Sequence, residues 1–518
     1  MNRLTDLLDA AAATPSAIAL IDGDRWVTYE VLSRLSNQAA RALSARGVRV
    51  GDRVIVALEN GVEMVAAYFG AMRAGAVAVP LPPGRRSDRL SAAIADCTPQ
   101  AAVVDDATAR HPATRELLAA VPVVLTLEPA SGEPAGAGFR AALAAVDDAP
   151  VPPLGTDTGL AAIIYTSGST GRPRGVMLTH RNFVSNAEAI ISYLRLTAAD
   201  RVMCVLPFTY VYGLSLLHTH VAVGGSVVLE NRAAFPNVVL RGMQEHHVTG
   251  FAGVPSTFAM MLHRSNLADT PLPDLRYVTQ AGGAMPPARI REWLAKGPRA
   301  DFYVMYGATE AAARLTYLPP ADLPRKLGSI GRAVPGVVIR VVDDQGYDVT
   351  APGGVGELVA SGPNISPGYW GMADETAERF SREGYRTGDL GYADDEGFLF
   401  ITGRRHDMIK VGANRVGARE IEDVLLEHPA VSEAVVVGAP DDLLGEVPVA
   451  FVTLRAALPD PVATLRGHVA ATSAPYKVPV EVTVLADLPR LSTGKPDRMQ
   501  LQSRGRGKRP APHTPRVR

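Results

Sequence analysis

The first part of the chain alternates short apolar runs with segments of helical spacing, and this alternation restricts the possible folds more than any other feature. Arg53–Leu58 is strand-like, Gly61–Arg73 carries apolar residues at helical spacing, and Gly75–Pro80 and Ala101–Val104 are again short and apolar. Strands that alternate with helices predict βαβ units. We therefore expect a mostly parallel sheet covered by helices.

The residue composition and the predicted elements change several times after this region. The segment 128–156 is rich in Pro, Gly, Ala and Asp, and most of it is predicted to be surface loop. A second α/β stretch follows, with strands predicted at 201–206 and 226–229. From about Lys326, short strands and Gly/Pro turns indicate a smaller β-rich unit. The charged segment 403–409 then separates this unit from the rest of the chain.

The C-terminal part is predicted to form a separate small domain. Helices are expected at 416–427 and 462–471 and strands at 434–437 and 449–454, a mixture typical of an α+β domain. The tail from Ser503 is basic, rich in proline and almost without apolar residues, which predicts disorder.

The predicted fold class is therefore α/β. It has a large N-terminal region, made of two α/β sheet subdomains and a β-rich subdomain, and a small mobile α+β C-terminal domain. The predicted boundaries are 1–403 for the N-terminal region, 404–502 for the C-terminal domain and 503–518 for the disordered tail. A chain of 518 residues agrees with the roughly three or four domain-sized units that its length predicts.

Composition argues against several classes of partner. The 52 Lys and Arg residues nearly balance the 53 Asp and Glu residues, so the chain as a whole lacks the excess positive charge typical of proteins that bind nucleic acid or membranes. Two cysteines are too few for a disulfide framework and favour a reducing compartment. Asp6 and Asp9 interrupt the region where a signal peptide needs an apolar run, and no apolar stretch reaches the roughly 20 residues of a spanning helix. We expect a cytoplasmic protein without a membrane span or a nucleic-acid partner.

The most informative motif is Tyr165–Val176, YTSGSTGRPRGV, which follows a short apolar strand. Its glycines let backbone N–H groups wrap a phosphate, and its hydroxyls and arginines supply further donors. It is not a Walker loop, because no GK[ST] closes it. Taken alone, such a Gly/Ser loop is also compatible with a purely structural turn.

The complete string resembles the phosphate loop of the adenylate-forming superfamily, which contains acyl/aryl-CoA synthetases, peptide-synthetase adenylation domains and luciferases. Five further motifs occur in the family's order and spacing, so that the resemblance covers nearly the whole chain. These motifs are Gln280–Ala284, Tyr306–Glu310 (YGATE), Tyr385–Leu390 (YRTGDL), Gly403–Arg404 with Ile409–Gly412, and Pro489–Lys495. The chain is similar to a stand-alone AMP-dependent acyl-CoA synthetase or ligase.

The resemblance implies sites for ATP and Mg²⁺. Glu310 is expected to bind Mg²⁺, Thr309 to contact the α-phosphate, and the Tyr306 ring to pack on adenine. Asp389 is expected to accept hydrogen bonds from both ribose hydroxyls, and Arg404 also reaches the ribose. The full set implied for ATP or AMP is Thr166, Ser167, Gly168, Ser169, Thr170, Gly171, Arg174, Gly283, Ala284, Tyr306, Gly307, Thr309, Asp389 and Arg404.

Residues 1–403 are then expected to be the ATP- and acid-binding adenylation domain, and residues 404–502 to carry the catalytic lysine. Lys495 is implied to contact both the attacking carboxylate and the forming phosphorane, and with Thr309 and Glu310 it completes the catalytic set. The family's phosphate loop ends in PKG, whereas Arg174 here keeps the charge but changes the donor geometry. The pivot of the hinge is either His406 or Asp407.

The acid site is less clearly specified. Tyr210 occupies the position where many acyl-CoA synthetases have a histidine, and an aromatic gate or a plain core residue both fit. No acidic residue lies between Pro207 and Leu217 to pair with an α-ammonium group, which argues against ordinary α-amino acids. The pocket is expected to be mainly apolar, lined by Tyr210, Gly282 and Ala308.

Three polar residues near this region have competing interpretations. Arg314 lies four residues after Glu310, on one face of a predicted helix. The sequence favours a solvent-exposed salt bridge for it over a role in offsetting a second negative charge on the substrate. His218 and His220 lack the acidic or cysteine partners of a metal site and are expected to pack or to form hydrogen bonds.

We predict an ATP-dependent, AMP-forming ligase that adenylates a small-molecule fatty or aryl carboxylic acid. The acyl group is then expected to pass to the thiol of coenzyme A or of the phosphopantetheine on a separate acyl or peptidyl carrier protein. The alternative is an adenylate-forming enzyme with a non-thiol second step, such as amide formation or nitrite-dependent diazotisation. The sequence leaves open the identity of the acid, the choice of acceptor and the oligomeric state.

Overall fold

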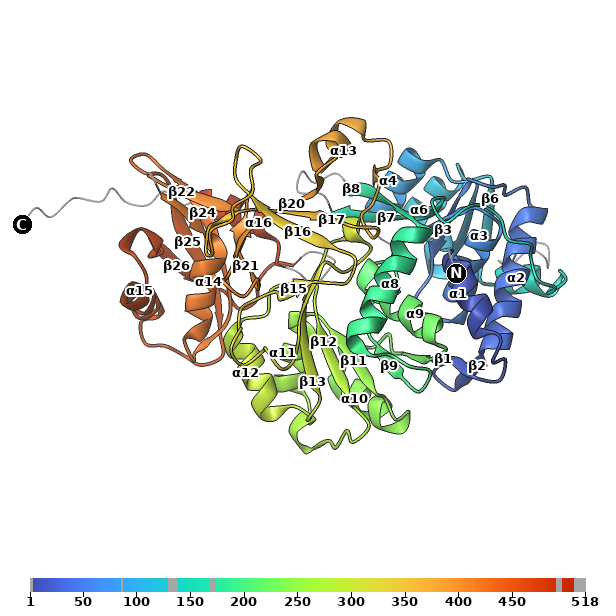
Figure 1. Cartoon of the computed structure of the whole chain (residues 1–518), viewed down its shortest axis with the longest axis horizontal. Helices are drawn as coiled ribbons and strands as arrows, with labels where there is room; N and C mark the ends of the chain where they lie inside the picture. Colours follow the sequence, from blue (N-terminus) through green and yellow to red (C-terminus); the bar gives the residue numbers. More distant parts are fainter. Residues whose placement is uncertain are drawn as a thin grey trace, which may run out of the picture.

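The computed structural model describes residues 3–84, 87–128, 138–167, 173–405, 407–412, 414–490 and 496–506. Within these residues the strands form four sheets (Figure 1). Two large sheets belong to the N-terminal region, a smaller one follows, and the fourth is built from C-terminal strands. The structure thus confirms a mixed α/β fold with a β-rich unit and a C-terminal α+β unit.

The first large sheet has the strand order β18-β8-β7-β4-β3-β5-β6 in the described part of the chain. Its central strands pair in parallel and are rich in buried Val, Ile and Ala, as expected for a sheet covered on both faces. The strands are β3 Arg53–Ala57, β4 Val77–Pro80, β5 Ala101–Val104, β6 Val123–Thr126, β7 Leu160–Ser167, β8 Pro173–Thr179 and β18 Gly368–Tyr369.

The second large sheet has the order β15-β14-β13-β12-β11-β9-β10-β1-β2 among the described residues. Strands β13, β12, β11, β9, β10 and β1 run parallel, so their carboxyl ends share one edge. The strands are β1 Ile18–Asp22, β2 Arg25–Thr28, β9 Arg201–Cys204, β10 Ser226–Leu229, β11 Gly250–Gly253, β12 Tyr277–Gln280, β13 Asp301–Tyr306, β14 Thr316–Leu318 and β15 Arg332–Ala333.

Helices α8 and α9 lie between these two sheets (Figure 1), where the largest apolar cluster of the molecule is found. The helices of the N-terminal region are α1 Leu4–Ala11, α2 Tyr29–Ala45, α3 Val62–Arg73, α4 Ser87–Cys97, α5 Asp106–Arg110, α6 Pro112–Leu118, α7 Phe139–Ala144, α8 His180–Leu194, α9 Val211–Val223, α10 Pro236–Glu245, α11 Pro255–Arg264 and α12 Pro287–Lys296.

The two histidines of α9 are core residues. His218 Nε2 lies 3.1 Å from the Tyr68 hydroxyl, and His220 Nε2 lies 3.1 Å from the Tyr277 hydroxyl. Burial lowers the pKa of His218 to about 3 and that of His220 to about 4, so both rings are neutral at pH 7. The expected packing and hydrogen-bonding role is confirmed for both.

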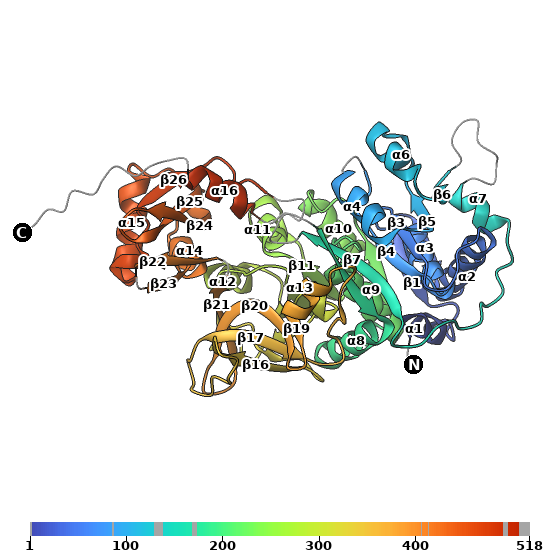
Figure 2. The same cartoon turned by 90° about the horizontal axis from the view of Figure 1, so that it is seen from above.

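The remaining elements form the β-rich and C-terminal units, and α14 of the latter packs beside α12 (Figure 2). The β-rich unit contains β16 Val338–Val342, β17 Gly356–Ser361, α13 Ala373–Arg379, β19 Phe380–Ser381, β20 Gly384–Ala393 and β21 Leu399–Arg404. The C-terminal unit contains β22 Met408–Val411, β23 Asn414–Gly417, α14 Ala418–Glu427, β24 Val431–Asp441, β25 Gly445–Leu454, α15 Pro461–Thr472, β26 Glu481–Val484 and α16 Arg498–Arg506.

Three local predictions need correction. Within 128–156, most of which was expected to be surface loop, Phe139–Ala144 form the unpredicted helix α7, which the buried Phe139 anchors to the core. The helix expected to begin at Val416 begins at Ala418, because Val416 pairs with Ile409 in the sheet. The tail does not become irregular at Ser503, because α16 continues to Arg506; residues 507–518 lie outside the described residues.

No helix in the described part of the chain is long and apolar enough to cross a membrane.

Candidate active site

The candidate site lies where β11, β12 and β13 end side by side. Gly253 pairs with Gln280, and Gln280 pairs with Val304, so the segments that follow β12 and β13 leave the sheet next to each other. These segments are the predicted motifs Ala281–Ala284 and Gly307–Glu310. The carboxyl edge of a parallel sheet is the usual position of ligand sites in α/β proteins.

Close packing fixes the glycines of these two segments. Gly282 has φ +79°, and a Cβ there would lie 2.9 Å from Val254 Cγ1. A Cβ on Gly307 would collide with the Ala313 carbonyl oxygen. Both glycines are thus required by the close packing of the local backbone. Gly282, Gly283 and Ala284 are exposed, whereas Ala308 is half-buried.

Three of the predicted nucleotide residues form one hydrogen-bonded cluster around Asp389. The Tyr306 hydroxyl donates to Asp389 Oδ2 at 2.5 Å, and Arg404 Nε donates to Asp389 Oδ1 at 3.1 Å. Asp389 and Arg404 are paired across β20 and β21. Burial and the Asp389 carboxylate raise the pKa of Tyr306 well above its usual value, so the phenol keeps the proton that it donates.

Glu357 holds the turn that presents Asp389. Its buried carboxylate forms ion pairs with Arg386 at 2.7 Å and with Arg405 at 3.2 Å. The same carboxylate accepts the Gly388 N–H at 3.1 Å. The strands that carry Asp389 and Arg404 are therefore tied together directly beside the Asp389 cluster.

A second cluster connects Glu310 with the phosphate-loop hairpin. The Tyr369 hydroxyl donates to Glu310 Oε1 at 2.8 Å, and the Arg174 guanidinium lies over the Tyr369 ring, 5.5 Å from its centroid. Thr166 and Arg174 face each other across β7 and β8, where the Thr166 hydroxyl donates to the Arg174 carbonyl oxygen at 3.5 Å. Thr309 begins the 3-10 turn that carries Glu310.

Sequence reasoning missed Tyr369. It reaches Glu310 because β18 pairs with β8, which places Tyr369 opposite Val176 at the base of the hairpin. The sequence signal is weak: a Gly-Tyr-Trp run far along the chain from both Glu310 and Arg174. Only the strand pairing brings these residues together.

Among the described residues, one carboxylate fits the kind of site that holds Mg²⁺ together with substrate phosphates. They contain no group of three or more His, Cys, Asp or Glu side chains arranged to hold a metal. Mg²⁺ is commonly held by one or two carboxylates plus substrate phosphates, with water completing its octahedron. Half-buried Glu310, whose Oε1 accepts the Tyr369 hydroxyl, is a carboxylate of this kind beside the phosphate-loop hairpin.

Several predicted residues lie outside the described part of the chain. These are Gly168, Ser169, Thr170 and Gly171 of the phosphate loop, the hinge candidate His406, and Lys495. Ser167 is described as the last residue of β7. Asp407, the other hinge candidate, lies between β21 and β22, where its N–H donates to the Arg404 carbonyl oxygen at 3.0 Å.

On the acid side, two tyrosines at the start of α9 have different neighbours. The Tyr210 hydroxyl accepts a hydrogen bond from Arg89 Nη1 at 3.0 Å, so this half-buried ring lies against α4. Tyr212 is buried, donates to the Thr279 carbonyl oxygen at 2.9 Å, and borders Gly282. Tyr212, which sequence reasoning passed over, is thus the aromatic residue beside the Gly282 segment.

The predicted helix after Glu310 is wrong. The turn Thr309–Ala311 ends at Ala312 and Ala313, which have φ values of +53° and +127°. Arg314 consequently turns inward and is 2% exposed. The solvent salt bridge that the sequence favoured for Arg314 is excluded by this burial.

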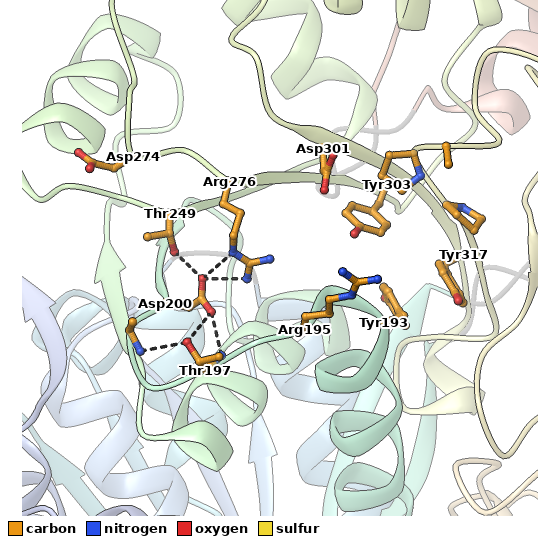
Figure 3. Close-up of a pocket in the computed structure, with 14 residues that line it drawn as sticks. Tyr193, Arg195, Thr197, Asp200, Thr249, Asp274, Arg276, Asp301, Tyr303 and Tyr317 are labelled. Carbon is orange, nitrogen blue, oxygen red and sulfur yellow. Dashed lines mark hydrogen bonds and ion pairs between the residues drawn. The ribbon is translucent and has the colours of Figure 1, made fainter.

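A cavity of about 760 Å³ lies at the opposite edge of the second sheet, by the amino ends of β9, β12 and β13 (Figure 3). It is lined by Arg195, Tyr303 and Tyr317 and by an Arg276–Asp200 ion pair of 2.8 Å. None of the predicted site residues lines this cavity, so we place the candidate active site at the carboxyl edge.

The chain matches the family model described as AMP-binding enzyme over residues 7–370, and that described as AMP-binding enzyme C-terminal domain over residues 420–495. It is 34% identical over 494 residues to indoleacetate–CoA ligase of Aromatoleum aromaticum, with 94% of each chain covered.

Two solved structures are also similar over nearly their whole length. One is the anthranilate CoA ligase AuaEII in complex with anthranoyl-AMP, with a TM-score of 0.90, 26% identity and 97% of both chains covered. The other is the amide bond synthetase McbA from Marinactinospora thermotolerans, with a TM-score of 0.86, 28% identity, and 97% of this chain and 99% of that chain covered.

Proposed function

The chain belongs to the family of AMP-binding enzymes, as its motifs predicted, and we propose that it is an AMP-forming acid–thiol ligase. In the first half-reaction, a carboxylate oxygen of the substrate attacks the α-phosphorus of ATP. The bond to pyrophosphate breaks, and an acyl-adenylate forms. In the second half-reaction, a thiolate attacks the carbonyl carbon and AMP leaves. The thiol belongs to coenzyme A or to a carrier-bound phosphopantetheine.

One observation carries this proposal: two carboxylates with different partners, Asp389 and Glu310, lie near the carboxyl end of β13. Asp389, held by Tyr306 and Arg404, is a carboxylate that accepts hydrogen bonds, as recognition of a ribose diol requires. Glu310 accepts a hydrogen bond from Tyr369, whose ring lies against the Arg174 guanidinium, so an acid and a cation flank one tyrosine, as recognition of metal-bound phosphates requires. A nucleoside triphosphate has both a ribose diol and phosphates that bind a metal ion.

The barrier to adenylation is largely electrostatic, because a carboxylate must approach a polyphosphate. Arg174 and the loop N–H groups bind the β- and γ-phosphates, and Lys495 brings a cation to the attacking carboxylate. Bound at Glu310, Mg²⁺ supplies charge neutralisation of the phosphate oxygens. Residues 404–502 rotate about the turn at Asp407 or His406, so that Lys495 withdraws and the thiol enters.

The acid is a fatty or aryl carboxylic acid without an α-ammonium group. Gly282 and Ala308 offer only small apolar surfaces, and no acidic side chain lies between Pro207 and Leu217. The names of the indoleacetate and anthranilate ligases favour an aryl acid. Both cysteines are free and buried, in keeping with our assignment of the protein to the cytoplasm.

Amide formation is the second candidate function. The similarity to the amide bond synthetase McbA favours it, because an amine attacking the same acyl-adenylate needs no change in the adenylation site.

ATP–pyrophosphate exchange, measured without any thiol across fatty, aryl, amino and inorganic acids, tests the first half-reaction. Exchange with one fatty or aryl class is the expected result, and product analysis with coenzyme A, a phosphopantetheinylated carrier or an amine then identifies the second half-reaction. Exchange with amino acids or nitrite alone would contradict the proposed acid class.

Tyr210→Ala is expected to broaden acid tolerance. If Tyr210 walls the pocket, removing its ring should raise kcat/KM for longer or bulkier acids by on the order of 10-fold relative to the best wild-type acid. The KM for ATP should stay nearly constant, because the Tyr210 hydroxyl bonds with Arg89 and, among the described residues, shares no hydrogen bond with the Asp389 or Glu310 clusters. An unchanged acid profile would assign Tyr210 to the core instead.

A further inference from the structure

Arg314 is a buried cation without a counter-ion among the described residues. Its side chain is almost fully covered, and no described carboxylate forms an ion pair with it. Of its five N–H donors, Nη1 reaches the Ala313 carbonyl oxygen at 3.5 Å, and Nε has no hydrogen-bond partner. A buried guanidinium in this condition is costly, because neither water nor an anion compensates its charge.

The neighbours of the guanidinium are aromatic and neutral. It lies over the Tyr212 ring, 4.8 Å from the centroid, and the Tyr193 hydroxyl is close to it. Burial raises the pKa of Tyr193, and that of Tyr212 to about 12, so both phenols are uncharged at pH 7. The cation–π contact and the Tyr193 hydroxyl offset part of the desolvation of Arg314, but Nε stays without a hydrogen-bond partner among the described residues.

The position of Arg314 connects it to the acid pocket. Its Cα lies 3.0 Å from the position that a Cβ on Gly307 would take. Tyr212, which the guanidinium covers, borders Gly282: its Cδ1 lies 4.0 Å from the position that a Cβ there would take. Gly307 adjoins Ala308 in the chain. The backbone of Arg314 thus packs against Gly307, and its guanidinium lies against Tyr212, the residue that borders Gly282.

The backbone that places Arg314 there is strongly constrained. Two alanines with positive φ precede it, a conformation that residues other than Gly, Asn and Asp seldom adopt. The side-chain amides of Asn186 and Asn364 both donate to the Arg314 carbonyl oxygen, at 3.0 and 2.9 Å. The fold therefore holds an unpaired buried charge in a strained turn, a combination that is characteristic of functional positions.

We propose that Arg314 binds a second anionic group of the substrate, so that the enzyme adenylates an acid with a distal carboxylate or sulfonate. This inference rests on the proposed function. One carboxylate attacks ATP, a short apolar or aryl spacer occupies the space beside Gly282 and Ala308, and the distal anion accepts hydrogen bonds from the guanidinium. A planar guanidinium binds such oxyanions in a bidentate manner.

The test compares each acid with a partner of the same length and no distal charge. Pyrophosphate exchange is measured with aliphatic α,ω-dicarboxylates, benzene dicarboxylates and their sulfonate analogues, each beside its distal monomethyl ester. The wild type is expected to prefer at least one dianion over its ester. Arg314→Met should lower kcat/KM for that dianion on the order of 100-fold while the ester is retained, and Arg314→Lys should recover part of the loss.

Arg73→Met is the matched control. Arg73 is also a buried arginine, but it is paired with Asp9 at 2.5 Å and donates to Ser36 at 2.8 Å, on α3. Its removal should lower the thermal midpoint and leave the dianion-to-ester ratio unchanged. Arg314→Met should leave the thermal midpoint of the ligand-free protein unchanged or raise it, because it removes an uncompensated charge.

The outcomes separate the two proposals. If exchange with esters and monoacids equals or exceeds exchange with every dianion, the role of Arg314 is overturned and the adenylation proposal stays intact. The same conclusion follows if Arg314→Met leaves the dianion-to-ester ratio unchanged. If Arg314→Met fails to fold, the wild-type ratio and Arg314→Lys decide the matter. Absence of exchange with every acid would count against adenylation itself and would remove the inference with it.

Discussion

Replacing Lys495 with alanine is expected to abolish acid-dependent ATP–pyrophosphate exchange while sparing thioester formation from presynthesised acyl-adenylate. The lysine is proposed to place a cation between the attacking carboxylate and the α-phosphate, and loss of one such preorganised charge costs on the order of 10²–10³ in rate. The second half-reaction starts after pyrophosphate has left, so it should not need this cation. Both half-reactions are measured on the same preparation, by isotope exchange and by thioester release.

The variant should fold, because the described residues on either side of Lys495 are anchored by contacts that do not involve it. The Asp497 N–H donates to the Pro489 carbonyl oxygen at 2.7 Å, and Arg490 forms an ion pair with Glu433 at 2.6 Å. Lys477→Ala is the control, since Lys477 is a lysine of the same unit that pairs with Glu420 at 2.5 Å, and both half-reactions should survive its loss. An equal fall in both half-reactions of Lys495→Ala would show that its assigned role is wrong.

The parts of the fold that sequence predicted well are those in which local pattern and burial agree. The strand Ala101–Val104 was predicted with its observed bounds, because four small apolar residues between turn signals fit a strand buried on both faces. The helix α15 was predicted to within a residue at each end. Asp460, whose side chain accepts the Ala463 N–H at 3.0 Å, caps its start.

The local errors occur where a long-range contact overrides composition. The Pro- and Gly-rich character of 128–156 concealed α7, which is held by the burial of Phe139 against the rest of the core. Val416 was assigned to a helix on apolar spacing, yet its β-branched side chain is buried in a strand that pairs with Ile409. Neither partner can be read from the neighbouring sequence.

The candidate site shows the same division. Motif spacing predicted Tyr306, Asp389 and Arg404, and the structure brings these three into contact. Motif spacing gave no indication of Tyr369, whose contact with Glu310 depends on the pairing of β18 with β8. The sequence pattern predicted an exposed helix face for Arg314, whereas the left-handed Ala312 and Ala313 turn its side chain inward. Alanine runs favour helices, and only the tertiary contacts of this turn exclude one.

The second large effect is expected for Asp389→Asn, which keeps the size of the side chain but removes its charge. The carboxylate is proposed to accept the ribose hydroxyls, and hydrogen bonds to a charged acceptor contribute about 1.5–3 kcal/mol each. The change should therefore lower kcat/KM for ATP on the order of 100-fold, mainly through a higher KM. Steady-state exchange with ATP as the varied substrate measures this, and the KM for the acid should change little.

Tyr306→Phe separates the role of the carboxylate from that of its neighbours. It removes only the hydroxyl that donates to Asp389 at 2.5 Å and retains the ring proposed to pack on adenine. This variant loses one hydrogen bond to the carboxylate but keeps the carboxylate itself, so a fall of about 10-fold in kcat/KM for ATP is expected. If Asp389→Asn raised the KM for the acid and left that for ATP unchanged, Asp389 would belong to the acid site. The carboxylate would then have to act on something other than the nucleotide.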